Sequence, residues 1–227
     1  TIGDKLHEEK TKRLLISSIN FLKENKTNPN FNLFFTYIAG FIAHYIIDKT
    51  THPFIYQRTT TYPEHKKLEI NIDTYLVNQF WQQQTYQLSP TKAINLKNNQ
   101  IKTIIKPYYQ YILQTVYNTS DKITCITDSY KDFKKVMTLF YSPYRIKKQI
   151  LKLINFLLPL DISILIYPKQ ASYNLLTITE YKNFTKLLER AVEEGVQLLN
   201  MVNTYLNSNL KEDILNSQFS DVSFNGK

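Results

Sequence analysis

Apolar side chains recur along most of the chain at the three- and four-residue spacing that is typical of helices. This spacing predicts a first helix over about 5–24 and a second, strongly apolar helix over about 31–51. The second helix is expected to end at His52, because Pro53 disfavours helical geometry in the residue before it. A third helix is expected over about 63–84, with its proline in the first turn, where no backbone donor is lost.

The remaining two thirds of the chain carry weaker helical patterns. The stretch "LSPTKAINLKNN" is expected to form a loop, residues 160–178 are ambiguous with "ISILIY" resembling a strand, and 209–227 are expected to fray. Further helices are predicted over about 99–118, 128–141, 143–158 (with Ser142 as cap and Pro143 in the first turn) and 180–206. The pattern predicts a single all-α domain, with metal-site helices over about 5–84 and a helical scaffold over about 96–208.

Composition narrows the function classes. The chain has only 4 Gly in 227 residues, which makes glycine-rich phosphate loops and tight hairpins unexpected. Its net charge of +9 suits an anionic partner such as phospholipid headgroups or nucleic acid. An AT-rich genome would also raise the Lys, Asn, Ile and Tyr content, and the lysines are spread along the chain. Nothing in the composition indicates an oligomeric state.

Three further features concern the cysteine, the N-terminus and the apolar stretches. Cys125 is the single cysteine, which excludes an intramolecular disulfide, and it is interpreted as a small core residue. The N-terminus is charged and does not resemble a signal peptide, which predicts a cytoplasmic protein unless a leader once preceded Thr1. The apolar stretches 31–47 and 150–167 contain polar residues, so both are interpreted as buried helices and not as membrane spans.

Three of the four histidines lie between residues 44 and 65. His44, Asp48 and His52 are four residues apart on the second predicted helix, so they project from one face within little more than two turns. Imidazole and carboxylate groups on adjacent turns can bind a metal ion together, as two histidines at this spacing do in zinc proteases. Taken singly, His44 has an ordinary explanation as a core histidine and Asp48 as a hydrogen-bonding partner of a neighbour.

The same spacing recurs on the third predicted helix. His65 and Glu69 are four residues apart, and Asp73 follows four residues later. Alone, His65 and Glu69 would be interpreted as a solvated pair. Two consecutive helices that both carry histidines with carboxylates at this spacing favour a zinc site, since zinc takes nitrogen from His and oxygen from Asp or Glu. Antiparallel packing would bring the two rows of side chains together.

The pattern H-x3-D-x3-H-P followed by H-x3-E resembles the core signature of the zinc-dependent bacterial phospholipases C, whose fold is shared with single-strand-specific zinc nucleases. The stretches "LHEEKT", "YIAGFIAHYIIDKTTHPFIY" and H-x2-LE-x2-ID resemble the phospholipase C-like branch most closely. "YKNFTKLLERAVEEGVQLL" is similar to that branch's C-terminal helix. The resemblance covers about residues 3–80 well, and it implies an all-helical protein with one to three zinc ions.

The resemblance implies a role for each matching residue. It implies that His44 and Asp48 are ligands of a paired-metal site, in which Asp48 bridges the metals or orients the attacking water, and that His7 is a further ligand there. It implies that a separate zinc is held by the following residues: His52, His65 and Glu69. Asp73 is expected to hold a ligand imidazole from behind. Members of the family have a segment before this point that supplies further ligands, so the chain beginning at Thr1 is expected to have an incomplete paired site and reduced or no activity.

Three functions remain open from the sequence. The first is a phospholipase C-type phosphodiesterase acting on phospholipid, with peripheral membrane contact, in which Phe54, Tyr56, Tyr62 and Trp81 could line a cleft. The second keeps the metals but takes single-stranded nucleic acid, which basic charge and exposed aromatics also suit. The third is a non-catalytic helical protein that uses its basic surface to bind a partner or a membrane. A histidine–aspartate phosphohydrolase is disfavoured, because the chain lacks a His-Asp dipeptide.

Overall fold

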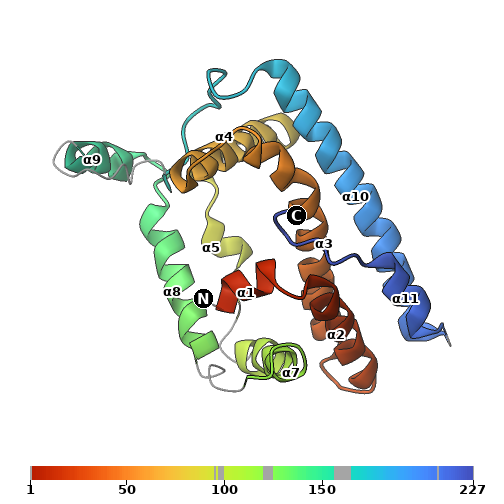
Figure 1. The fold of residues 1–227 in the computed structure, drawn as a ribbon. Coiled ribbons are helices and arrows are strands. Elements are labelled where there is room, and N and C mark those ends of the chain that lie inside the picture. The colour runs from red at the N-terminus through yellow and green to blue at the C-terminus, as the bar shows by residue number, and fades with distance from the viewer. Residues whose placement is uncertain are drawn as a thin grey trace. The chain divides into compact units, whose positions relative to one another are not determined.

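The computed structural model describes residues 2–94, 96, 100–119, 125–155, 165–208 and 210–226, and in these ranges the chain forms helices and loops without a strand (Figure 1). The predicted all-α class is therefore confirmed. The elements are α1 (Ile2–Glu8), α2 (Thr11–Glu24), α3 (Phe31–Tyr56), α4 (Tyr62–Trp81), η1 (Thr85–Gln87), α5 (Pro90–Ala93), η2 (Ile101–Ile105), α7 (Lys106–Thr115), α8 (Cys125–Phe140), α9 (Ile146–Asn155), α10 (Ile178–Asn207) and α11 (Glu212–Gln218).

Contacts divide the chain into two compact units that interleave along the sequence. Unit 1 comprises residues 1–53, 96–128 and 186–227, and unit 2 comprises residues 54–95 and 129–185. Helices α3, α8 and α10 each contribute residues to both units. The expectation of a single domain stays a prediction.

Unit 1 has a core of aliphatic and tyrosine side chains. Leu14, Leu15 and Ile19 of α2 are fully buried, and so are Ile38 and Ile42 of α3. These positions recur every three to four residues, so each helix buries one stripe against its neighbours. A buried hydrogen bond of 2.8 Å between the hydroxyl groups of Ser18 and Tyr108 joins α2 to α7.

Unit 2 is organised around Tyr181 on α10. The Tyr181 ring stacks on Tyr75 of α4, with centroids 4.1 Å apart. The buried amide of Asn71 donates to the Tyr181 hydroxyl, and its carbonyl oxygen accepts from the Ser172 backbone N–H at 2.6 Å. The amide thereby ties α4 to the chain before α10, and a buried amide with satisfied hydrogen bonds is strongly orienting.

The predicted first helix is two helices, α1 and α2. Lys10 lies between them with φ 55° and ψ 36°, in the left-handed region. Contacts distant in sequence hold the break: the Lys10 ammonium donates to the Val116 carbonyl at 3.1 Å, and the Tyr117 hydroxyl donates to the Glu9 carbonyl at 2.9 Å. The spacing of apolar residues could not reveal these partners.

The prediction that the second helix ends at His52 was wrong, because α3 continues through Pro53 to Tyr56. Phe54 and Ile55 are both buried. Their packing outweighs the cost of a proline inside the helix. Among the described residues α3 is also the one helix long and apolar enough to cross a membrane. Ile38, Ile42 and Ile46 are fully buried, but only 28% of the most apolar window of α3 is buried, so the interpretation as a core helix stays a prediction.

Several later expectations also need correction. The expected loop from Leu88 contains the short α5, and the expected 99–118 helix consists of η2, whose hydrogen bonds are π-helical, followed by α7. The helix expected from Pro143 begins at Ile146. The end of that helix at 156–158 and residues 162–164 of "ISILIY" lie outside the described residues, as does the side chain of Cys125, whereas 165–167 form no strand.

The expected frayed tail was wrong. Residues 212–218 form α11, and the side chains of Leu215, Phe219 and Phe224 are buried. The mostly polar composition of this segment suggested fraying, but its three buried apolar side chains pack it onto the rest of unit 1. This docking brings the tail to the candidate site.

Candidate metal centre

The first group of candidate ligands lies in unit 1 and is built on α3. His44 and Asp48 are one turn apart, and His44 Nε2 lies 3.4 Å from Asp48 Oδ2. The carboxylate of Asp48 is 17% exposed, whereas the His44 side chain is 50% exposed. The fully buried Tyr45 and Ile46 lie between them in sequence and hold the helix in the core. The two polar groups therefore stand beside each other at the margin of that core.

His7 joins this pair from α1. Its ring lies edge-on to the His44 ring, with centroids 5.8 Å apart. His7, His44 and Asp48 each offer one ligand atom, and these atoms all lie within 4.8 Å of one another. A single cation could therefore be reached by all three after small side-chain rotations. Two imidazoles and one carboxylate are a donor set that zinc takes in catalytic sites, so the residues present fit a zinc ion.

Backbone carbonyl groups orient the imidazoles of unit 1. His7 Nδ1 lies 3.0 Å from the Gly3 carbonyl oxygen, and His52 Nδ1 lies 2.9 Å from the Phe224 carbonyl oxygen. A carbonyl can only accept, so each ring donates from Nδ1, and its lone pair is then on Nε2. Metal-binding histidines are oriented in this way by a hydrogen bond from their other ring nitrogen.

The C-terminal segment covers this group. The Phe224 ring packs against the rings of His7 and His44, with centroid distances of 4.7 and 5.5 Å. The Phe224 backbone N–H also donates to the His7 carbonyl at 3.1 Å. Gly226 has φ +73°, and a Cβ there would lie 2.5 Å from Cγ of Pro53, so only glycine allows this close approach to α3.

Burial lowers the pKa of His44 below its ordinary value of 6.5. The Asp48 carboxylate opposes this shift, while His7 and His52 reinforce it. The net effect keeps the His44 imidazole neutral at pH 7. Neutral imidazole is the form that binds a metal ion, so the surroundings prepare this side chain for ligation.

The second row of candidate ligands lies on α4, in unit 2. His65 Nε2 lies 3.1 Å from Glu69 Oε1, and the Lys66 ammonium donates to Glu69 Oε2 at 2.8 Å. The ring of Tyr56 packs on the His65 ring at 4.8 Å. Asp73, one turn beyond Glu69, accepts a hydrogen bond of 3.0 Å from the Tyr167 hydroxyl. The role expected of Asp73, holding a ligand imidazole, stays a prediction.

The start of α4 is fixed by its own sequence. Thr61 is the N-cap, its hydroxyl accepts from the Glu64 backbone N–H, and the Glu64 carboxylate accepts from the Thr61 backbone N–H. Pro63 lies in the first turn, as predicted. The Glu64 carboxylate also accepts hydrogen bonds from the backbone N–H and the hydroxyl of Thr60. The bonds from Thr60 are the main cause that lowers the pKa of Glu64, and those from Thr61 add to it. The position of His65 on the helix follows from this cap.

Sequence reasoning missed the contacts that surround the ligands. The Gly3 and Phe224 carbonyls and the Phe224 ring carry no residue-type signal for metal binding. The grouping of His52, in unit 1, with His65 and Glu69, in unit 2, stays a prediction.

The sequence model of the family described as "Zinc dependent phospholipase C" matches residues 1–119 of this chain. The match covers more than half of the 227 residues, and it includes the first helix and both ligand rows. The chain belongs to the zinc-dependent phospholipase C family, a family of hydrolases, and the resemblance in its histidine pattern is confirmed. No curated protein and no solved structure matches the chain.

Proposed function

We propose that the protein is a zinc-dependent phosphodiester hydrolase of the phospholipase C type, which acts on phospholipid. Family membership supports the reaction class. The observation that carries the proposal is the convergence of His7, His44 and Asp48, whose ligand atoms lie within 4.8 Å of one another although two helices supply them.

In this proposal the candidate ligands form two groups, and each group binds one zinc ion. His7, His44 and Asp48 would hold one zinc, and the hydrogen bond from His7 Nδ1 to the Gly3 carbonyl would leave Nε2 of His7 as the ligand atom. A second zinc is held by His52, His65 and Glu69, a grouping that rests on the spacing of these residues in the sequence and on the family pattern. Bound zinc lowers the pKa of its water to about 7 and polarises a phosphoryl oxygen.

Asp48 has a further role in the proposal. Its carboxylate is largely buried beside His44 and can accept a hydrogen bond from the attacking water while one oxygen remains a ligand. A carboxylate in this place would orient the water towards phosphorus and could receive its proton. No side-chain nucleophile is needed for the reaction.

The test combines metal content with turnover in wild type and in Asp48→Asn. Zinc per chain would be measured by plasma mass spectrometry, and phosphocholine release would be measured from phosphatidylcholine vesicles. We expect Asp48→Asn to lose zinc and to reduce turnover by at least about a hundredfold. Asp213→Asn, the same change at an exposed acid of α11, is the control and should leave both unchanged.

The outcomes separate the functions that the sequence left open. Hydrolysis of single-stranded DNA in preference to phosphatidylcholine would replace the lipase with a nuclease that uses the same ligands. Zinc binding without turnover on either substrate would make the protein a non-catalytic metal protein. Absence of zinc from wild type after zinc is supplied would refute the proposal.

A further inference from the structure

We propose that helices α8 and α9 form a docking surface for an anionic lipid bilayer. The inference goes beyond the proposed function, because it concerns helices that carry none of the candidate metal ligands and does not require catalysis. Its starting point is the way in which α9 is attached to the rest of the unit.

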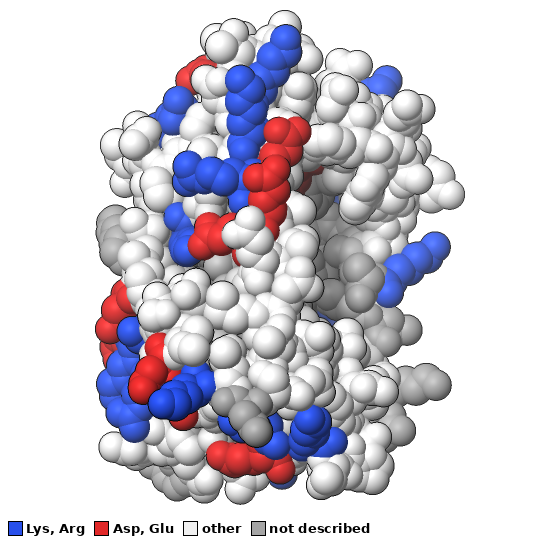
Figure 2. Space-filling model, turned by 90° about the vertical axis from the view of Figure 1, so that its right-hand side faces the viewer, with Lys and Arg blue, Asp and Glu red and all other residues white. Residues whose placement is uncertain are grey.

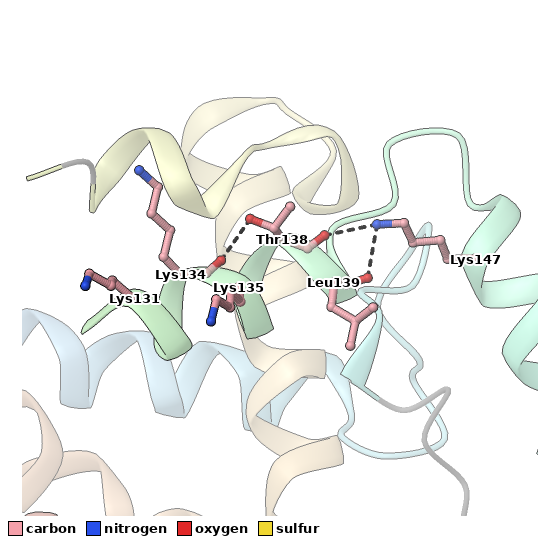
Figure 3. A pocket seen from close by; sticks show the side chains of 6 residues that line it. All are labelled: Lys131, Lys134, Lys135, Thr138, Leu139 and Lys147. Carbon is pink, nitrogen blue, oxygen red and sulfur yellow. Dashed lines mark hydrogen bonds between the residues drawn. The ribbon is translucent and has the colours of Figure 1, made fainter. Parts of the chain in front are cut away.

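Helix α9 is held by its lysine side. The Lys147 ammonium donates to the Thr138 and Leu139 carbonyls at the end of α8, at 3.0 and 3.1 Å (Figure 3). The Lys148 ammonium donates to the Ile166 carbonyl at 2.8 Å. These bonds satisfy carbonyl groups and fix which face of α9 is turned towards unit 2.

The apolar stripe of α9 is consequently turned to solvent. Its members recur at the spacing of one helical face, and each is at least 36% exposed: Ile146, Ile150, Leu153 and Ile154. An amphipathic helix in a globular protein normally turns this stripe to the core. Among the described residues this orientation leaves the apolar face exposed, and it is therefore open to a binding partner.

Helix α8 also carries exposed apolar side chains. Phe133, Val136 and Leu139 are 46%, 47% and 62% exposed. Met137 and Phe140, by contrast, line a cavity of about 260 Å³ within unit 2, so α8 has a packed side as well as an exposed one.

Lysines are concentrated on the same two helices. An open hollow is lined by Lys131, Lys134 and Lys135 of α8 and by Lys147 of α9, whose side chains are drawn in Figure 3. Residues 125–155 carry seven Lys and Arg against two Asp, so this seventh of the chain holds a net charge of +5 out of the protein's +9. On the face shown in Figure 2, basic and acidic side chains instead lie beside one another in mixed clusters.

Charge and shape together select a bilayer as the occupant. Aliphatic side chains next to lysines suit the boundary between anionic headgroups and acyl chains. A juxtaposed lysine cluster is attracted to the negative potential of such a surface. Nucleic acid would satisfy the lysines, but it would leave the aliphatic stripe without a gain from burial.

The experiment is co-sedimentation of the full chain with two kinds of vesicle. One contains phosphatidylcholine alone, and the other also contains about 30% phosphatidylglycerol. We expect binding to the anionic vesicles, weakened as salt screens the charges. Ile150→Gln/Leu153→Gln and Lys131→Gln/Lys135→Gln should each weaken binding roughly tenfold. Val192→Gln/Val196→Gln and Lys182→Gln/Lys186→Gln on α10 place the same changes on exposed positions elsewhere and should bind like wild type.

Asp48→Asn separates this proposal from the proposed function. It should bind vesicles like wild type while losing hydrolysis, so failure of catalysis does not imitate failure of docking. Circular dichroism would establish that each variant is folded. The docking surface is refuted if anionic vesicles do not bind, if the α10 controls lose binding equally, or if single-stranded DNA binds in place of vesicles. It is also refuted if the Ile150/Leu153 variant changes only the oligomeric state, measured by light scattering.

Discussion

The two rows of candidate ligands are held in place by different kinds of contact. On α4, the His65–Glu69 pair and the lysine beside it are bonded within one helix, and the helix start is set by the cap at Thr61. The group of His7, His44 and Asp48 depends instead on Phe224, which is more than 170 residues from each of them. The α4 row is held by contacts local in sequence, whereas the α3 group depends on tertiary contacts.

The largest expected effect comes from removing the packing of the α3 group. Phe224→Ala should lower the free energy of unfolding by about 3–5 kcal/mol, because a fully buried aromatic ring leaves a cavity against His7, His44 and Tyr45. Urea denaturation would measure the loss. Zinc content should fall as well, since His7 loses the contact that positions its ring.

Tyr56→Ala is the matched change beside the α4 row. Its ring also packs on a candidate ligand, His65, but it is 38% exposed, so the expected loss is smaller, on the order of 1 kcal/mol. Equal losses in the two variants would break the comparison, because the α4 row would then depend on surrounding packing as much as the α3 group does.

A smaller effect is expected from Lys66→Gln on α4. The Lys66 ammonium occupies one oxygen of Glu69 and repels a second cation. Exposed or half-exposed pairs of this kind are worth about 0.2–1 kcal/mol, so zinc affinity at His65 and Glu69 should rise by up to about fivefold. Competition with a zinc-binding dye would measure it, with Lys67→Gln on the same helix as control. Weaker zinc binding in Lys66→Gln would show that the ammonium positions the carboxylate.

The smallest effect concerns the cap that orients the α4 row. Hydrogen bonds lower the pKa of Glu64 below its ordinary 4.5, so the folded state binds this proton less readily than the unfolded state does. The stabilisation is complete above pH 4.5 and is lost as the pH falls through the folded-state pKa. Wild type should therefore exceed Glu64→Gln in melting temperature near neutral pH, and the difference should shrink in acid. A difference that grows in acid would contradict the assignment.

The same distinction explains what the sequence could and could not predict. The one-turn spacing of His44 with Asp48, and of His65 with Glu69, is a property of neighbouring residues. It could therefore be predicted from the sequence, together with the helices that carry these pairs. The break between α1 and α2 at Lys10 could not be predicted, because contacts with Val116 and Tyr117 hold it. The continuation of α3 beyond Pro53 depends on the burial of Phe54 and Ile55, which overrides a local preference. Phe224 stood in a segment whose composition is polar.

The contact between His7 and Phe224 joins residues that are synthesised at different times. Ribosomes add about 5–20 residues per second, so roughly 10–45 seconds separate the synthesis of these two residues. Until Phe224 is added, His7 and His44 lack its aromatic cover, and His52 lacks the Phe224 carbonyl that accepts a hydrogen bond from its ring. A zinc ion that arrives before Phe224 is added would meet candidate ligands without this packing, whereas a later one would meet them with their rings held in place. We therefore expect zinc to bind more tightly once the segment that carries Phe224 has been synthesised and packed.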